Sequence, residues 1–134
     1  MIVSDTNLIV HLYVESVGSP LAREILLRDP EWAAPALWRS EFRSALTTII
    51  RSRLMDLDDA LRIMDSAELM MGDTEGEVSS DDVIELSAEK GCSAYDAEYV
   101  VLARGLGVPL VTVDKELLEK FPGTAVSPES FLAR

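Results

Sequence analysis

Apolar residues along this chain are spaced in two ways, and the alternation predicts strands and helices in turn. Short apolar runs at residues 1–5, 31–35 and 108–113 predict buried strands, and weaker strands are expected around Val78 and at 124–126. Apolar residues at helical spacing predict the helices between them, at residues 6–14, 19–28, 36–54, 56–71, 80–90 and 95–105 and after Asp114. This alternation favours an α/β fold with a mostly parallel sheet, and no linker or repeat divides the 134 residues into more than one domain.

Two of the predicted strands are followed directly by an acidic residue. Asp5 follows the first strand, and Asp114 follows the strand at 108–113. Because the carboxyl ends of parallel strands share one edge of a sheet, both side chains are expected at that edge, where α/β proteins bind ligands. Aspartate is also a common N-cap between a strand and a helix, so position alone leaves a structural and a functional interpretation open.

Two further acids lie on helices at positions that border a buried face. Glu41 flanks the apolar stripe that begins at Trp38, and a carboxylate there costs free energy unless it is paired or binds a metal. Asp96 fits a capping box that starts at Ser93, yet at helical spacing it heads the apolar face that continues through Tyr99. Four acids from four segments therefore indicate a cluster of carboxylates.

The overall charge limits how such a cluster can be stabilised. The chain has 24 acidic and 12 basic residues, a formal net charge of −12, which argues against a broad basic surface that follows nucleic-acid phosphates. Carboxylates held close together raise one another's pKa, and a hard divalent cation with oxygen ligands removes that conflict. The acids therefore predict a site for one or two Mg²⁺ or Mn²⁺ ions, which would recruit phosphate oxygens.

Cysteine usage and hydropathy bear on the cellular compartment. The single cysteine, Cys92, can form no disulfide within the chain, which suits a reducing cytoplasm. No apolar run approaches the roughly 20 residues that a membrane span needs. We therefore expect a cytoplasmic protein without a membrane partner.

The acids lie in motifs that resemble a known family. Asp5 lies in Val3-Ser-Asp-Thr-Asn7, Asp96 in Ser93-Ala-Tyr-Asp-Ala-Glu-Tyr-Val-Val-Leu-Ala103, and Asp114 in Pro109-Leu-Val-Thr-Val-Asp114. Together with Glu41, these motifs resemble those of PIN-domain nucleases, and in particular the small VapC-type toxins of toxin–antitoxin pairs. The resemblance extends essentially from end to end of the chain.

The resemblance implies a three-layer α/β/α sandwich, formed by a single PIN-like domain over residues 1–134. It also implies a Mg²⁺- or Mn²⁺-dependent endoribonuclease that acts on RNA, is inhibited by a cognate antitoxin and forms a homodimer. Carried over to this sequence, it makes Asp5, Glu41, Asp96 and Asp114 the metal-binding acids. Thr112 would support the site beside Asp114, and Asn7 would be a polar neighbour of Asp5.

Several roles stay open in the sequence. Glu41 either binds a metal or acts as a general base on the attacking water. Arg39, Arg43 and Lys115 are candidates to guide RNA phosphates, and a solvated helix face explains them equally well. The apolar excess over residues 54–71 suggests a surface for a second copy or an antitoxin.

Other classes of protein compete with the nuclease interpretation. One is a noncatalytic protein-binding module in which the acids are only helix caps, and another is a housekeeping PIN nuclease without an antitoxin. Haloacid-dehalogenase-like enzymes need a second acid two residues after the first, where this chain has Asn7. Response-regulator receivers need paired acids at the first strand, and Asp5 has no acidic neighbour.

Overall fold

Five parallel strands form the centre of the computed structural model, which describes residues 1–134. Their order across the sheet is β3-β2-β1-β4-β5. The strands are short, and they are β1 (Ile2–Ser4), β2 (Trp32–Pro35), β3 (Glu75–Gly76), β4 (Leu110–Val111) and β5 (Ala125–Val126). Every neighbouring pair is parallel, as the alternation of strands and helices predicts.

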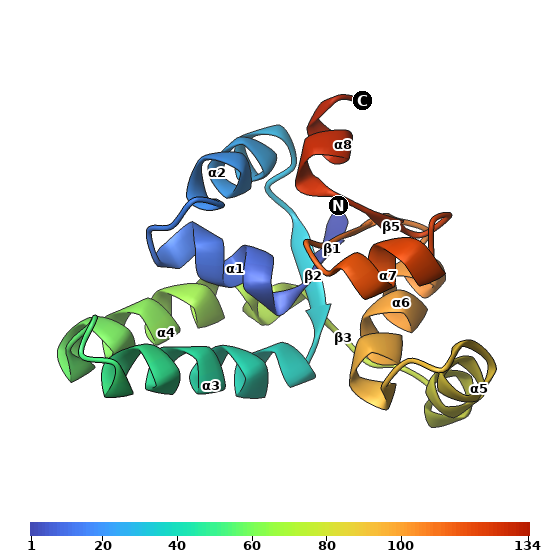
Figure 1. Ribbon diagram of the computed structural model, residues 1–134, viewed down its shortest axis with the longest axis horizontal. Helices are drawn as coiled ribbons and strands as arrows, with labels where there is room; N and C mark the ends of the chain where they lie inside the picture. Colours follow the sequence, from blue (N-terminus) through green and yellow to red (C-terminus); the bar gives the residue numbers. More distant parts are fainter.

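Helices cover both faces of this sheet and give three layers. Figure 1 shows α1 to α4 on one side of the strands and α5 to α7 on the other. The helices are α1 (Thr6–Tyr13), α2 (Ser19–Arg28), α3 (Leu37–Arg51), α4 (Leu57–Met71), α5 (Ser80–Lys90), α6 (Ala94–Leu106), α7 (Lys115–Lys120) and α8 (Pro128–Leu132), with a 3-10 turn η1 (Gly72–Thr74). The predicted α/β/α sandwich is therefore confirmed. A membrane-spanning helix is not among these elements, since each is too short or too polar for that role.

The sheet is buried on both faces, which explains why its strands are continuous apolar runs. Ile2 and Val3 of β1 are fully buried, and so is Leu110 of β4. Helix α6 packs across β1, β2 and β4 through residues such as Val100 and Ala103, both of which are fully buried. A strand without a solvated face has no need of alternating polar positions.

The chain changes direction across the sheet at β1, and this fixes the place of the ligand edge. After β1 it moves outward through β2 to β3, and it then returns to add β4 on the other side of β1. Val3 of β1 is in register with Ala33 of β2 and Leu110 of β4. The connections that follow β1 and β4 therefore diverge at the carboxyl ends of these strands and leave a crevice between them.

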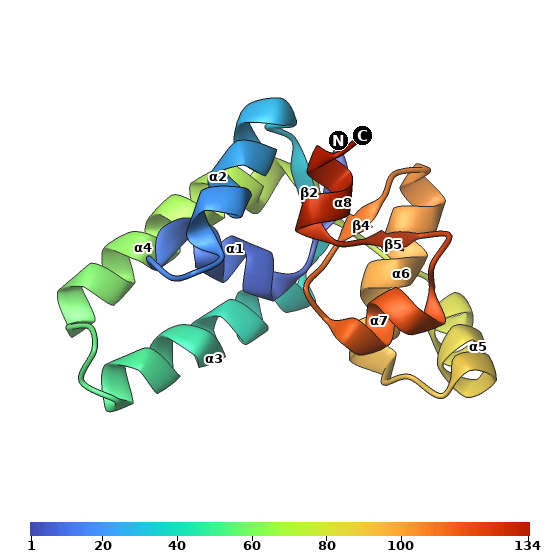
Figure 2. The same cartoon turned by 45° about the horizontal axis from the view of Figure 1, so that its top comes forward.

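Two elements differ from the prediction. The expected strand around Val78 is wrong, because the third strand is Glu75–Gly76, which pairs with Ala34 and Pro35 of β2. Helix α8 was not predicted, although Ser127 caps it through the Ser130 N–H and Pro128 occupies its first turn. Helix α8 packs on α2, and Figure 2 shows it at the end of the chain, directly after β5.

Two glycines at the end of α6 allow a matched test of the fold. Gly107 ends the helix at φ 68°, whereas Gly105 lies inside the helix, and neither would bring a new Cβ within 4 Å of another atom. We expect Gly107→Ala to lower the free energy of unfolding by about 1–2 kcal/mol, since the left-handed conformation strains an L-residue. Gly105→Ala should raise it by about 0.5–1 kcal/mol. Urea denaturation measures both, and shifts of equal sign would contradict the described helix end.

Candidate active site

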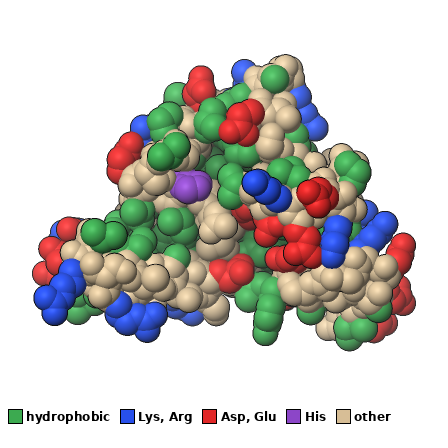
Figure 3. All heavy atoms as spheres, viewed as in Figure 1, with side chains coloured by type: hydrophobic (Ala, Val, Ile, Leu, Met, Phe, Trp, Pro, Cys, Tyr) green, Lys and Arg blue, Asp and Glu red, His purple; other side chains and the backbone are tan.

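A cleft of about 930 Å³ opens at the switch point, where β1 and β4 end. All four predicted acids line it, and so does Asn7, which is exposed beside them. Acidic side chains gather at the centre of the molecular face in Figure 3, next to apolar surface. No lysine or arginine lines this cleft. A second groove, of about 650 Å³ between α5 and α6, contains none of the four acids.

Asp5 is held from three directions at the base of the cleft. It is the N-cap of α1, where its Oδ1 accepts a hydrogen bond from the Leu8 N–H at 2.8 Å. Its Oδ2 accepts from the Thr112 hydroxyl and from the Val113 N–H. Burial nevertheless raises the pKa of Asp5, and the nearby Asp114 carboxylate raises it further, although these hydrogen bonds oppose the shift.

Thr112 connects the ends of the two central strands. Its hydroxyl, which is fully buried, donates to Asp5 and accepts from the Asp114 N–H at 3.0 Å. Asp114 is itself the N-cap of α7, since its Oδ1 accepts from the N–H groups of Glu116 and Leu117. Its other oxygen makes no hydrogen bond within the protein. Thr112 thus links the Asp5 carboxylate to the backbone of Asp114.

Asp96 reaches the cleft from the first turn of α6. Ser93 caps this helix by accepting a hydrogen bond from the Asp96 N–H at 3.0 Å, as the predicted capping box requires. The Asp96 carboxylate has no ion-pair partner. Burial raises the pKa of Asp96, and the negative charges of Asp114, Glu116 and Glu41 add to this effect. The shift shows that these acids share one electrostatic environment.

Glu41 comes from α3 and is held by two hydroxyl groups. Its Oε1 accepts hydrogen bonds from the Tyr99 hydroxyl at 2.6 Å and from the Thr6 hydroxyl at 3.0 Å. The two hydroxyl oxygens are 2.7 Å apart, so the three oxygens form a triangle. Burial and the hydrogen bond to Glu41 raise the pKa of Tyr99 well above its ordinary value, so this phenol stays protonated and can donate.

Thr6 and Tyr99 were not recognised as site residues in the sequence. A tyrosine on a core-facing helix stripe needs a partner for its hydroxyl, and this need is the one sequence signal by which Tyr99 could have been found. Its partner, Glu41, is 58 residues away along the chain. Only the packing of α3 against the switch point brings the two together.

The chemistry of this donor set fits a hard divalent cation. Glu41, Asp96 and Asp114 each present at least one carboxylate oxygen without a protein donor, and no buried side-chain oxygen is left unsatisfied. These free oxygens are therefore open to solvent in the cleft. No three acids surround a single point at ligand distance. The arrangement suits an ion that keeps part of its water shell, as Mg²⁺ commonly does.

The predicted phosphate-guiding residues lie outside the cleft. Arg39 forms ion pairs with Glu68 of α4 and Glu75 of β3, and it stacks on the Trp38 ring, so it braces α3 and is not available to substrate in the cleft. Arg43 and Lys115 are exposed and do not line the cleft. The site therefore has no basic residue of its own.

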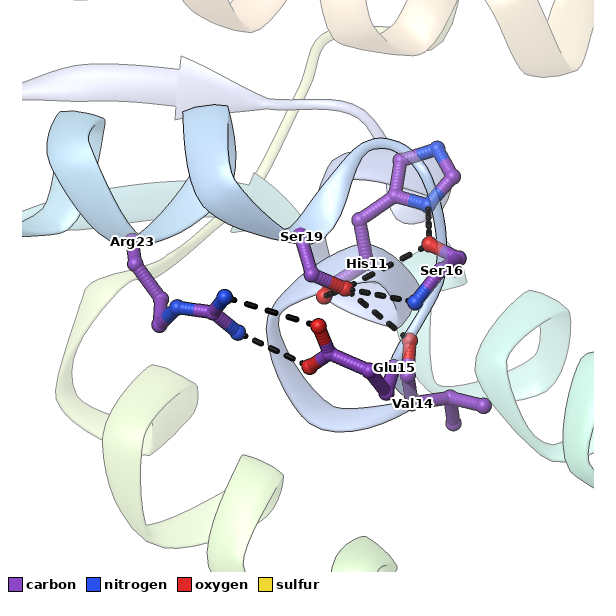
Figure 4. A network of polar contacts seen from close by, with 6 residues as sticks. All are labelled: His11, Val14, Glu15, Ser16, Ser19 and Arg23. Carbon is purple, nitrogen blue, oxygen red and sulfur yellow. Dashed lines mark hydrogen bonds and ion pairs between the residues drawn. The ribbon is translucent and has the colours of Figure 1, made fainter.

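The single histidine, His11, belongs to a separate network at the far end of α1. Figure 4 shows Ser19 at its centre, donating to the His11 carbonyl at 2.6 Å and accepting from the Ser16 N–H at 2.9 Å. The His11 ring contacts the Ser16 hydroxyl at 2.7 Å, and Arg23 pairs with Glu15 nearby. These contacts fix the turn between α1 and α2.

A parallel α/β domain with a carboxylate-lined cleft at its switch point defines a recognisable class of protein. The sequence profile of the PIN domain matches residues 2–122, and the chain belongs to the PIN domain family. The predicted family is therefore confirmed.

Individual relatives agree with this assignment. Ribonuclease VapC3 from Pyrobaculum aerophilum is 30% identical over 134 residues, which covers 90% of this chain and 95% of the relative. Exonuclease VapC9 from the same organism is 28% identical over 126 residues, which covers 94% of this chain and 74% of the relative. The likeness to VapC-type proteins is therefore confirmed.

Solved structures share the fold. The crystal structure of PAE2754 from Pyrobaculum aerophilum has a TM-score of 0.73 and 26% identity, and the match covers 98% of this chain and 93% of that one. A toxin–antitoxin complex from Klebsiella pneumoniae has a TM-score of 0.68 at 16% identity, with 96% and 98% covered, and this likeness concerns the fold alone.

The unbalanced charge of the cleft predicts an unusual pH dependence for the metal-free protein. The pKa of Asp96 is raised on folding from an ordinary value of 3.8, so the folded state holds a proton more readily than the unfolded chain. Stability must then fall as pH rises above this value through the folded pKa. In EDTA we therefore expect Asp96→Asn to raise the melting temperature at pH 7 by about 2–4 °C, and we expect this gain to shrink as the pH is lowered toward 3.8.

Asp82 provides a matched control for this measurement. It occupies the same position after the cap Ser79 in α5 as Asp96 does after Ser93 in α6, but it lies outside the cleft. Asp82→Asn should leave the melting temperature unchanged or lower it slightly, because it only loses a favourable interaction with the helix dipole. A lower melting temperature for Asp96→Asn at pH 7 would show that the cleft acids do not repel one another.

Proposed function

We propose that this protein is a divalent-metal-dependent endoribonuclease, and that it is the toxin of a type II toxin–antitoxin pair. One observation carries the proposal, which is that four carboxylates from four elements line a single cleft that contains no basic residue. Such a cleft is costly without a cation and repels the RNA backbone, and bound Mg²⁺ or Mn²⁺ removes both problems. The names of the relatives Ribonuclease VapC3 and Exonuclease VapC9 support a nuclease.

Each acid has a role that follows from its contacts. Asp96 and Asp114 have free oxygens and would bind the ion directly or through water, and Asp5 would bind it from the base of the cleft. Such an ion lowers the pKa of bound water and neutralises a phosphate oxygen. Thr112, which donates to Asp5 and accepts from the Asp114 N–H, would keep these two acids in place around the ion. Glu41 would orient the attacking water, either as a further ligand or as the general base.

A partner surface is also part of the proposal. Leu54, Leu57 and Leu61 are 81%, 59% and 55% exposed at the turn into α4 and along its first half. Leu57 and Leu61 are one helical turn apart and so present a shared apolar face. We assign this face to a homodimer contact, which leaves the cleft open for RNA and for an antitoxin.

The metal-dependent step can be tested on the purified protein. We expect Mn²⁺ or Mg²⁺ at millimolar concentration to raise the melting temperature, since saturation at a hundred times Kd stabilises the fold by about 2.7 kcal/mol. Asp96→Asn and Asp114→Asn should lose most of this shift and should reduce RNA cleavage by at least about a hundredfold. Asp82→Asn should behave as the wild type does.

The choice of RNA substrate separates the possible activities. A circular RNA has no ends, so its cleavage in the presence of Mn²⁺ identifies an endonuclease, whereas digestion of linear RNA alone identifies an exonuclease. Mapping the cut ends from total RNA would then define the preferred site. If metal causes no thermal shift and no RNA is cut, the protein is a binding module and the nuclease proposal is wrong.

The dimer contact has its own test. We expect Leu57→Lys and Leu61→Lys together to convert a dimer into a monomer in light scattering after size-exclusion chromatography, because two charges would then be buried in the contact. Leu27→Lys is the matched control, since Leu27 is 86% exposed on α2 and outside this face. A wild type that is monomeric at high micromolar concentration would disprove the assigned contact.

A further inference from the structure

Glu41 is the only cleft acid whose carboxylate is held by side-chain hydroxyl groups from two other elements. Thr6 begins α1 directly after Asp5, Glu41 lies on α3, and Tyr99 lies on α6. Their oxygens are 2.6, 2.7 and 3.0 Å apart in a triangle that we call the hydroxyl triangle. Both hydroxyl-bearing side chains are buried, with Tyr99 only 3% exposed. The triangle therefore fixes the position of α3 relative to the switch point and to α6.

The two oxygens of Glu41 have different surroundings. Oε1 accepts both hydroxyl hydrogen bonds, and Oε2 accepts none from the protein. Because no buried polar side-chain atom lacks a partner, Oε2 must be reachable by water. Glu41 lines the cleft, and Oε2 is the one of its two carboxylate oxygens that no protein group occupies.

From this geometry we propose that Tyr99 and Thr6 are positioning residues that hold Glu41 with Oε2 directed into the cleft. This inference rests on the proposed nuclease function, since it explains how Glu41 is held in position to bind the ion or to orient the attacking water. A mobile glutamate side chain would lose conformational entropy when it contacts a bound ion or the water on that ion. The hydroxyl triangle restricts Glu41 already in the free protein, so this entropy is not lost again on binding.

Neutral donors suit this task better than a cation would. An arginine in place of Tyr99 would also fix Glu41, but its charge would cancel that of the carboxylate and weaken the attraction for a metal. Hydroxyl groups donate hydrogen bonds and leave the net charge of the cleft unchanged. The nearby Arg39 illustrates the difference, since it is fully engaged by Glu68 and Glu75 on the other side of α3.

The number of protons makes the two hydroxyl groups partly redundant. Three oxygen–oxygen contacts share two hydroxyl protons when Glu41 is ionised, so one contact always lacks a hydrogen bond. If one hydroxyl is removed, the other still donates to Glu41. Loss of both should therefore harm the site more than the two single losses combined.

The first experiment measures RNA cleavage and Mn²⁺ binding in parallel. We expect Tyr99→Phe to reduce kcat on the order of tenfold with KM for RNA unchanged, and Tyr99→Phe with Thr6→Val to reduce it on the order of a hundredfold. If Glu41 is a metal ligand, Mn²⁺ affinity falls as well, and if it is the general base, Mn²⁺ affinity stays constant. Either pattern supports the positioning role.

Tyr13→Phe is the matched control for the removal of a phenolic hydroxyl. Tyr13 also donates a hydrogen bond, to the Ser66 carbonyl at 3.2 Å, but it lies on α1 outside the cleft. This variant should keep the wild-type kcat. The positioning role is disproved if the wild type is active and Glu41→Gln is inactive, while Tyr99→Phe with Thr6→Val matches the wild type in both kcat and Mn²⁺ affinity.

A second experiment needs neither metal nor RNA. In EDTA, urea denaturation of wild type, Tyr99→Phe, Glu41→Ala and the double variant forms a cycle that isolates the coupling between the two side chains. We expect the change in urea midpoint caused by Tyr99→Phe to be much smaller in the Glu41→Ala background than in the wild type. The change caused by Tyr13→Phe should be the same in both backgrounds.

If the effects of Tyr99→Phe and Glu41→Ala on the midpoint simply add, the inference is overturned even if the nuclease proposal holds. If Tyr99 and Glu41 are coupled in this cycle but the protein cleaves no RNA, the proposed nuclease function is wrong and the contact between the two side chains still stands. If Tyr99→Phe does not fold, Thr6→Val completes the same cycle.

Discussion

Negative charge without a cationic partner inside the cleft is the constraint on which the rest of this site depends. The protein has enough basic residues to neutralise the four acids, and it places them elsewhere. Arg39 binds Glu68 and Glu75, and Arg23 binds Glu15. Buried carboxylates normally acquire such partners, because an unpaired charge in a low-dielectric site is expensive. Because the carboxylates in this cleft stay unpaired, they retain an affinity for cations. An arginine inside the cleft would pair with them and remove that affinity.

Stability for such a site must come from the surrounding scaffold. The parallel sheet is buried on both faces, and α6 covers its centre with a nearly continuous apolar surface. Hydrogen bonds supply the remaining order, since Thr112 joins Asp5 to the Asp114 backbone and the hydroxyl triangle joins three helices. All of these donors are neutral. The scaffold can therefore hold the acids in place without reducing their charge.

The sequence predicted the parts of the site that depend on local position, and it missed those that depend on packing. Asp5 and Asp114 follow apolar strands, so topology alone brought them to one edge. The partners of Glu41 and Arg39 are more than 25 residues away in sequence, and their identity depends on how α3, α4 and α6 pack. The strand Glu75–Gly76 was misplaced to Val78 for a related reason, since two residues carry almost no periodicity. Helix α8 differs, because its signals are local: Ser127 is its N-cap and Pro128 occupies its first position.

The structural and functional interpretations of the aspartates are not alternatives. Asp5 caps α1 through Oδ1 while its Oδ2 meets Thr112, and Asp114 caps α7 through one oxygen and leaves the other free. Capping fixes the carboxylate in one rotamer at the positive end of a helix, and the helix dipole lowers the cost of keeping it ionised. The same hydrogen bond that begins the helix therefore prepares the acid to bind a cation. Glu41 lies within a helix and has no such cap, so it needs the hydroxyl groups of Thr6 and Tyr99 to achieve the same order.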